Sequence, residues 1–240
     1  MKKVFLLIGA LVTMCSYSQS SEIIGSGSSA SNMYGGVQVS SGSNSGVWIK
    51  STASNSKVEG SYYLFNNWAN SASFYLLGNE GYKIPNVNFN VRFNRFEANM
   101  SDDASKDSIF AFNSQSVKKV VVGSKEFVKK QVSGKGANYF LEMIQEGDKL
   151  SLLKSYDASI SPGTINPMTQ QKMKADKIEI KSNFYVEKNG SLEEVRLKKS
   201  TVLKLMADKK VEIKEFLGDN DISFKNDADI KKIFSYYNSI

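Results

Sequence analysis

The side chains that perform most catalysis in proteins are scarce in this sequence. It contains no histidine, and its one cysteine is Cys15. Beyond Cys15, these absences exclude Ser-His-Asp triads, Cys-His nucleophiles, and zinc sites with histidine or thiolate ligands. Carboxylates are therefore the general acids and bases that remain available.

Carboxylate chemistry requires a particular arrangement of acids. A glycosidase places two carboxyl groups on either side of a cleft, roughly 5–9 Å apart. The acids that could form such a pair are Glu59, Glu80, Glu97, Asp102, Asp107 and Glu142. Most of the 24 acidic residues should be solvated surface groups, so no pair stands out. We predict no catalytic residue, and a carboxylate-based hydrolase of extracellular glycans is the alternative function.

Aromatic residues are dense between residues 62 and 82. Exposed rings in exported β-proteins stack on sugars or anchor partners, which makes Tyr62, Tyr63 and Trp68 the candidate ligand-surface aromatics. Large rings at this density are also normal core material, so packing in or at the rim of the core is the general expectation for the set. Adjacent strand residues face opposite sides, so only one of Tyr62 and Tyr63 can point into a core.

Two short motifs match ligand-binding loops only in part. Residues 133–136 place Lys135 between two glycines, whereas in a phosphate loop the lysine follows the second glycine and a helix comes next. Residues 219–221 resemble the start of a calcium loop, which would need glycine at the position of Phe224. We predict a plain turn at each place, and no cofactor or metal site.

A group of lysines falls on two neighbouring predicted strands. They are Lys118, Lys119, Lys125, Lys129 and Lys130. We expect a solvated face and a guarded strand edge, and the alternative is a basic strip that contacts anionic lipid or polysaccharide. The net charge of +7 is mild and no nucleic-acid-binding motif occurs, so no nucleic-acid partner is predicted.

The first 18 residues have the pattern of a secretory signal peptide. Lys2 and Lys3 precede a short apolar run over residues 4–12, and Ser16 and Ser18 suit a cut before Gln19. The apolar run is too short for a transmembrane helix, and none is predicted later in the chain. A lipid anchor at Cys15 is disfavoured because Met14 is too large for the cleavage position. We expect export to the periplasm, the outer membrane surface or the medium.

The remaining chain divides by composition into three parts. Residues 19–57 are a Ser/Gly-rich lead-in that is partly flexible, residues 58–197 an antiparallel β-domain, and residues 198–240 a group of helices. Within residues 87–94, Val87, Phe89, Val91 and Phe93 should face the core while the residues between them face solvent. The register changes at Arg95, which indicates a bulge or a strand end.

The other expected elements follow from similar patterns and from turn residues. Strands are predicted over residues 46–51, 61–65, 73–77, 108–112, 117–122, 125–131, 138–145, 150–156, 178–186 and 192–197. Turns are expected at residues 122–124, 146–148 and 188–190, and a long loop over residues 158–176. Helices should begin at a Ser200 or Thr201 cap and at an Asp227 cap, and a middle helix should end at Gly218.

These elements predict an α+β fold. An antiparallel β-meander, as a curved sheet, a sandwich or an open barrel, should be followed by a small C-terminal helical cluster packed on or beside it. A separate helical unit is the alternative. Residues 60–68 (GSYYLFNNW), the meander and the helical tail ending in YYNSI resemble uncharacterised exported β-rich proteins of Bacteroidetes bacteria. That resemblance implies export and this layout, and it assigns no site residue.

Export and the loss of common catalytic groups together suggest a function. We expect a non-catalytic envelope protein that binds a protein partner or a glycan through its β-surface.

Overall fold

The structure of the protein is a computed structural model. It describes residues 38–41, 46–50, 58–77, 81–100, 108–115 and 117–240. The predicted signal peptide, Cys15 and most of the lead-in lie outside these ranges. None of the helices within them combines the length and apolar composition that a membrane crossing requires.

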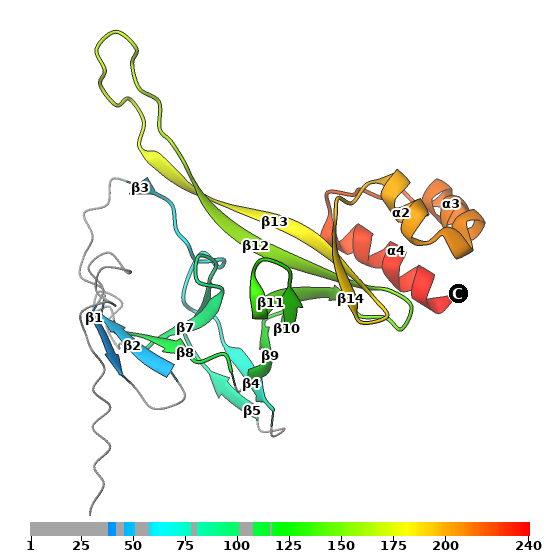
Figure 1. Ribbon diagram of the computed structural model, residues 1–240, viewed down its shortest axis with the longest axis horizontal. Coiled ribbons are helices and arrows are strands. Elements are labelled where there is room, and N and C mark those ends of the chain that lie inside the picture. Colours follow the sequence, from blue (N-terminus) through cyan, green and yellow to red (C-terminus); the bar gives the residue numbers. More distant parts are fainter. Residues whose placement is uncertain (1–37, 42–45, 51–57, 78–80, 101–107, 116) are drawn as a thin grey trace, which may run out of the picture.

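Two open sheets make up the β-rich part of the molecule (Figure 1). The smaller sheet is antiparallel and has the order β1-β2-β8-β7-β6. Its strands are β1 (Gln38–Ser41), β2 (Gly46–Lys50), β6 (Val87–Asn90), β7 (Arg95–Asn99) and β8 (Ser108–Phe112). The larger sheet has the order β14-β13-β12-β11-β10-β9-β4-β5, and β3 adds to β13 in parallel.

The strands of the larger sheet confirm most of the predicted pattern. They are β3 (Val58–Glu59), β4 (Ala72–Leu76), β5 (Gly81–Ile84), β9 (Val117–Val122), β10 (Lys125–Val132), β11 (Gly136–Gln145), β12 (Ser151–Ser161), β13 (Asp176–Lys188) and β14 (Ser191–Val195). Asn189 and Gly190 both have positive φ angles, as a type I′ turn between β13 and β14 requires. The sequence patterns do not predict β1, β3, β5 or β7.

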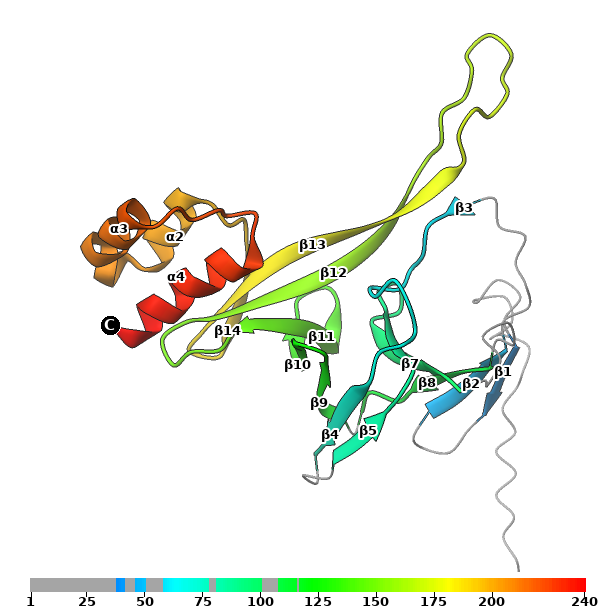
Figure 2. The ribbon, with the colours of Figure 1, turned by 180° about the vertical axis from the view of Figure 1, so that it is seen from behind.

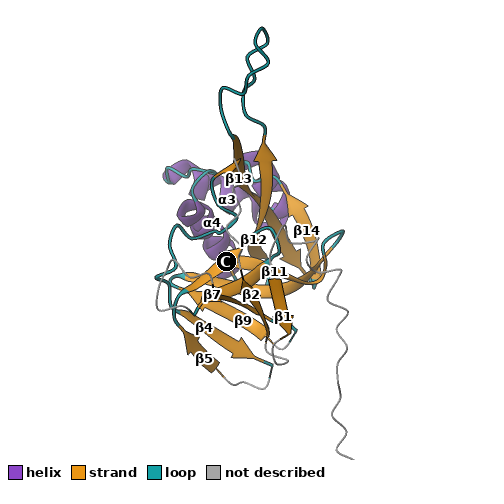
Figure 3. Cartoon of the chain, turned by 90° about the vertical axis from the view of Figure 1, so that its left-hand side faces the viewer, coloured by secondary structure: helices purple, strands orange, loops and turns teal. Residues whose placement is uncertain are grey.

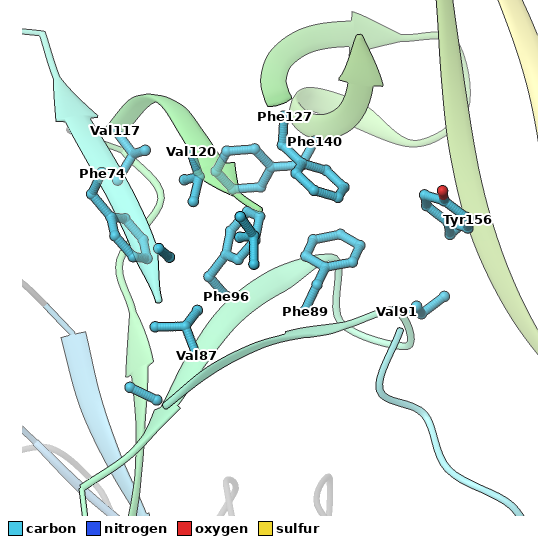
Figure 4. Packing of buried hydrophobic residues seen from close by; sticks show 13 residues of the cluster. Phe74, Val87, Phe89, Val91, Phe96, Val117, Val120, Phe127, Phe140 and Tyr156 are labelled. Carbon is cyan, nitrogen blue, oxygen red and sulfur yellow. The ribbon is translucent and has the colours of Figure 1, made fainter. Parts of the chain in front are cut away.

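The first hydrophobic core lies between the smaller sheet and part of the larger one. Figure 4 shows Phe96 of β7 among the rings of Phe89, Phe127 and Phe140, and Tyr156 of β12 lies at the edge of this cluster. The aromatic rings pack mainly edge to face or tilted, with centroids about 5 Å apart, as aromatic pairs in protein cores generally do. The β-region is therefore a sandwich at this end.

The C-terminal helices bury the other end of the larger sheet (Figure 2). They are α2 (Lys199–Leu205), the short 3₁₀ helix η1 (Ala207–Lys209), α3 (Lys210–Asp219) and α4 (Asp227–Ser239). Phe234 of α4 and Val202 of α2 share a second core with Leu150 and with Leu152 of β12. The predicted fold class, an antiparallel β-region followed by a small helical cluster, is confirmed.

The predicted helix ends need correction. Neither Ser200 nor Thr201 caps α2, because both lie inside the helix and its N-cap, Lys198, makes no side-chain cap bond. Gly218 lies within α3, which continues to Asp219. Asn226 caps α4 instead of Asp227, and its side chain accepts a hydrogen bond from the backbone N–H of Ala228. The prediction was one residue late because Asp227 favours the first turn as strongly as a cap position.

The simple in-and-out alternation predicted for residues 87–94 is wrong. Strand β6 ends at Asn90, a turn follows, and β7 begins at Arg95. Asn88 and Asn90 are buried along with their apolar neighbours, whereas Phe93 is exposed. The asparagine side of β6 is buried because residues 61–70 run along the free edge of this strand.

Residues 61–70 form an irregular edge segment rather than the predicted strand at 61–65. The backbone N–H of Leu64 donates to the carbonyl of Phe89 at 3.0 Å, and that of Val91 donates to the carbonyl of Tyr62 at 2.9 Å. Next to the Leu64 bond, the Asn88 amide accepts from the N–H of Phe65 and donates to its carbonyl, at 3.1 and 2.8 Å. The segment thus covers a sheet edge that would otherwise expose unpaired backbone groups.

Two more asparagines pair with a backbone in the same way. The Asn94 amide bonds to both backbone groups of Phe140, at 2.6 and 3.1 Å. The Asn238 amide bonds to both backbone groups of Leu150, at 3.1 and 2.9 Å. An amide side chain has the same donor and acceptor as a peptide group, so each asparagine replaces one residue of a missing strand.

The predicted loop over residues 158–176 is shorter than expected. Strand β12 continues to Ser161 and β13 already begins at Asp176, so the loop proper covers residues 162–175. The two strands pair without interruption from Ser151 opposite Glu187 to Ser161 opposite Lys177. They form a ribbon whose loop projects beyond the rest of the molecule (Figure 3).

Candidate functional site

The candidate site lies where β11 and β12 separate. Their ladder runs from Gln145 to Glu142 and ends there, opposite Lys154. Beyond this point the Asn94 amide bonds to the freed backbone of Phe140. The Tyr139 hydroxyl reaches across to β12 and donates to the carbonyl of Tyr156 at 3.2 Å. Two side chains therefore bridge the gap that the backbone leaves.

We expect Asn94→Ala to lower the free energy of unfolding by about 2–3 kcal/mol, since alanine loses both hydrogen bonds and is strained at a positive φ. The φ angle of Asn94 is 47°. Asn94→Gly removes the hydrogen bonds without the strain and should cost about 1–2 kcal/mol. Urea unfolding measures both values.

Asn189→Ala is the matched control, because Asn189 has a similar φ of 52° in an exposed turn. This variant should lower the free energy of unfolding by about 1 kcal/mol, the cost of placing alanine at a positive φ angle without any lost hydrogen bond. An Asn94→Gly variant as stable as the parent would contradict the role assigned to the amide.

A cleft of about 610 Å³ opens beside this gap. Four separate segments of the chain line it. The lining residues are Val91, Arg92, Phe93, Asn94, Arg95, Phe112, Asn113, Ser114, Lys135, Tyr139, Asp157 and Ala158. Its size is within the range of small-molecule sites, and polar side chains are mixed with rings, as is usual in such sites.

The lining of the cleft contains more cations than acids, although Arg95 pairs with Glu97 and Lys135 pairs with Asp157. Arg92, Arg95 and Lys135 face a single carboxylate, Asp157, among its lining residues. The guanidinium carbons of Arg92 and Arg95 lie 5.5 and 4.8 Å from the centre of the Phe93 ring. In the described part of the chain Arg92 has ring contacts but no ion pair. It is the cation best placed to accept an anionic group.

Asp157 is already satisfied by neighbouring donors. Lys135 Nζ lies 2.7 and 2.8 Å from its two oxygens, and Asn183 Nδ2 donates to Oδ2 at 2.9 Å. Burial, together with the nearby Asp157 carboxylate, raises the pKa of the Tyr139 hydroxyl. Tyr139 therefore stays protonated and can donate a hydrogen bond at any physiological pH.

The carboxylates proposed for hydrolysis do not form a facing pair where the structure describes them. Glu97 pairs with Arg95 Nε at 2.6 Å, and Glu142 pairs with Lys125 Nζ at 2.7 Å and accepts from the Tyr156 hydroxyl. Glu59 lies in β3. Glu80, Asp102 and Asp107 fall outside the described residues. No group of three or more metal-ligating side chains occurs among the residues with described positions.

The predicted aromatics have different roles. Tyr63 donates to Glu97 at 2.6 Å and packs edge to face on Trp68, with ring centres 4.7 Å apart. These two rings fix residues 61–70 to the smaller sheet, and both are partly buried. Tyr62 stacks under Arg92 at 5.0 Å and so stands beside the cleft. Of the three candidates, the structure places only Tyr62 near the site.

Four of the five lysines are held by neighbouring groups, Lys118 is exposed, and none of the five guards an edge. Strands β9 and β10 are interior strands of the larger sheet. Lys119 pairs with Glu126, Lys125 with Glu142, and Lys130 with Glu187, each within 3 Å. Lys129 donates to the carbonyls of residues 114 and 115 at 2.6 and 3.0 Å. The expected edge is wrong because β4 and β11 cover these strands on both sides.

Sequence reasoning gave no binding role to the residues that matter most here, namely Arg92, Asn94, Lys135, Tyr139 and Asp157, and it placed Lys135 in a plain turn. The positions of the arginines could have indicated the cleft. The sequence has three arginines among its 31 basic residues, Arg92, Arg95 and Arg196. The first two line this cleft, and Arg196 lines another of about 460 Å³ beside β14. In a chain that otherwise uses lysine, arginine marks places where planar, multidentate donors are needed.

Comparison with known proteins adds no family or relative. No family model matches the chain, and no curated protein or solved structure is significantly similar to it.

Proposed function

We propose that this chain is a non-catalytic protein of the cell envelope that binds an acidic glycan in the cleft beside Arg92. The observation that carries the proposal is the lining of the cleft, in which Arg92 has no ion pair among the described residues while Arg95 pairs with Glu97 and Lys135 with Asp157. A ligand rich in carboxylates and hydroxyls complements such a set of donors. Export, predicted from residues 1–18, would bring the chain to extracellular polysaccharide.

A glycan fits these side chains better than a flat protein surface does. Protein interfaces of standard size are broad and have a buried apolar centre. This site is concave instead, and its ring surfaces are Phe93 and, beside it, Tyr62. A pyranose ring can lie on an aromatic face while its oxygens accept hydrogen bonds from arginine.

The hydrolase alternative has less support. Hydrolysis would need a second carboxylate across the cleft from Asp157, and Asp157 is the one acid among the described lining residues. Its oxygens are occupied by Lys135 and Asn183.

Titration calorimetry with polygalacturonate tests the proposal. Arg92→Ala should weaken binding at least about tenfold, since a hydrogen bond to a charged group contributes about 1.5–3 kcal/mol. Binding should also weaken with added salt, and neutral dextran should bind much more weakly than the acidic polymer.

Arg196→Ala is the matched control, because it removes the same side chain from a different cleft. Its affinity should equal that of the parent. If Arg196→Ala weakened binding as much as Arg92→Ala, or if a panel of acidic glycans gave no heat, the proposal would fail.

A further inference from the structure

The ribbon formed by β12 and β13 ends in an exposed apolar tip. Figure 1 shows the ribbon extending away from both cores, and β3 pairs with the first two residues of β13, where the ribbon meets the loop. Near the end of the ribbon, Met168 is 92% exposed, Met173 is 68% exposed and Ile165 is 54% exposed. Single exposed apolar residues are common on proteins, but three on one projecting loop form a contact surface.

The backbone of the tip is hydrogen-bonded within the tip itself. The N–H of Met173 donates to the carbonyl of Thr164 at 2.8 Å, and that of Asn166 donates to the carbonyl of Gln171 at 2.9 Å. The Asn166 side chain accepts from the N–H of Met168 at 2.9 Å. These bonds pair part of the tip's backbone and so lower the penalty that its peptide groups would incur on leaving water.

The charges near the tip are positive. Residues 162–175 contain Lys172 and Lys174 and no acid. The nearest acid, Asp176, pairs with Lys172 at 2.8 Å and accepts a hydrogen bond from the N–H of Gly163. Lys174 and Lys177 have no ion pair within the described part of the chain. The loop that carries the apolar residues is therefore basic, whereas the adjoining strand ends contain Asp176 and, opposite Lys177 in register, Glu59.

We infer that this tip inserts into the interfacial layer of a bilayer that contains anionic lipid. Met168, Met173 and Ile165 would enter the boundary between headgroups and acyl chains, and Lys174 and Lys177 would lie at the phosphates. A protein partner is less favoured because the tip is convex and has few free backbone groups to offer to a strand or groove.

Two measurements on the processed protein test this inference, after mass spectrometry has established its N-terminus. The first uses Met168→Cys labelled with an environment-sensitive fluorophore. Its emission should shift to the blue with vesicles of phosphatidylglycerol and phosphatidylethanolamine, while labelled Val211→Cys on α3 should not respond. Val211 is exposed and lies on the helical cluster, away from the ribbon.

The second measurement is co-sedimentation with the same vesicles. Met168→Asp should lower the partition coefficient at least about tenfold, and Lys174→Gln about fivefold. Val211→Asp should leave it unchanged, and so should Met168→Leu.

Three results would overturn the inference. They are a silent fluorophore at residue 168, equal binding to vesicles of pure phosphatidylcholine, and an equal loss of binding in Val211→Asp. Binding of a soluble protein through Met168 without any vesicle binding would also overturn it, and would assign the tip to a protein contact.

Discussion

Replacing Phe96 with alanine is expected to lower the free energy of unfolding by about 3–5 kcal/mol, the largest effect of any single substitution proposed for this chain. Phe96 is 1% exposed and its ring contacts those of Phe74, Phe89, Phe127 and Phe140, at centroid distances of 4.9–5.8 Å. These partners belong to both sheets, so the ring joins the two layers (Figure 4). The surrounding rings cannot all move to fill the space that alanine leaves.

Urea unfolding followed by circular dichroism measures this effect. Leu77→Ala is the control, because Leu77 is a large apolar side chain that is mostly exposed. It should change stability by no more than about 0.5 kcal/mol. A loss under about 1 kcal/mol for Phe96→Ala would mean that the two sheets do not share one packed core.

The second large effect is expected at Glu97. This carboxylate is buried, and it accepts from Arg95 Nε at 2.6 Å, from the Tyr63 hydroxyl at 2.6 Å, and from the Asn90 amide at 3.2 Å. Glu97→Ala removes the shared acceptor from all three donors. We expect the free energy of unfolding to fall by about 3 kcal/mol. This value is at the low end for a broken buried ion pair, because the Arg95 side chain is 17% exposed to solvent.

The ion pair between Lys119 and Glu126 provides the control for Glu97. Both of its side chains are about one-third exposed, so Glu126→Ala should cost about 0–1 kcal/mol. Glu97→Gln keeps an acceptor for Tyr63 and should fall between the two alanine variants. Equal losses for Glu97→Ala and Glu126→Ala would contradict the role assigned to the buried network.

Local periodicity predicted the strands that bury one face. Strands β8 and β9 match their predicted ranges, and β4, β10 and β11 differ by at most two residues at an end. Periodicity failed where both faces of a strand are covered. In β7 the side chains of Phe96, Glu97 and Ala98 are all buried, so no alternation marks this strand. It failed again at the outer parts of β12 and β13, which are held by backbone pairing rather than by an apolar face.

The cleft could not be predicted from any local pattern. Its walls come from residues 91–95, 112–114, 135, 139 and 157–158, which only the folded topology brings together. Of the three aromatics that the sequence indicated, Tyr62 stands beside the cleft, whereas Tyr63 and Trp68 pack on each other in the edge segment. Tyr63 donates to the carboxylate of Glu97, 34 residues away in the chain, and Trp68 packs on the Tyr63 ring. Hydrophobicity alone does not distinguish such a pair from rings on a ligand surface.

The three asparagines that replace strand residues are also positions at which deamidation would affect the fold. Hydrolysis of a side-chain amide converts asparagine to aspartate, which at neutral pH is an acceptor only. At Asn88, Asn94 or Asn238 the new carboxylate would face the carbonyl oxygen to which the amide now donates. Each such lesion would turn an attraction into a repulsion at the edge segment, the cleft or the helix–sheet junction. Deamidation at these positions would therefore weaken the hydrogen bonds that join separate segments of the fold, without altering the apolar core residues.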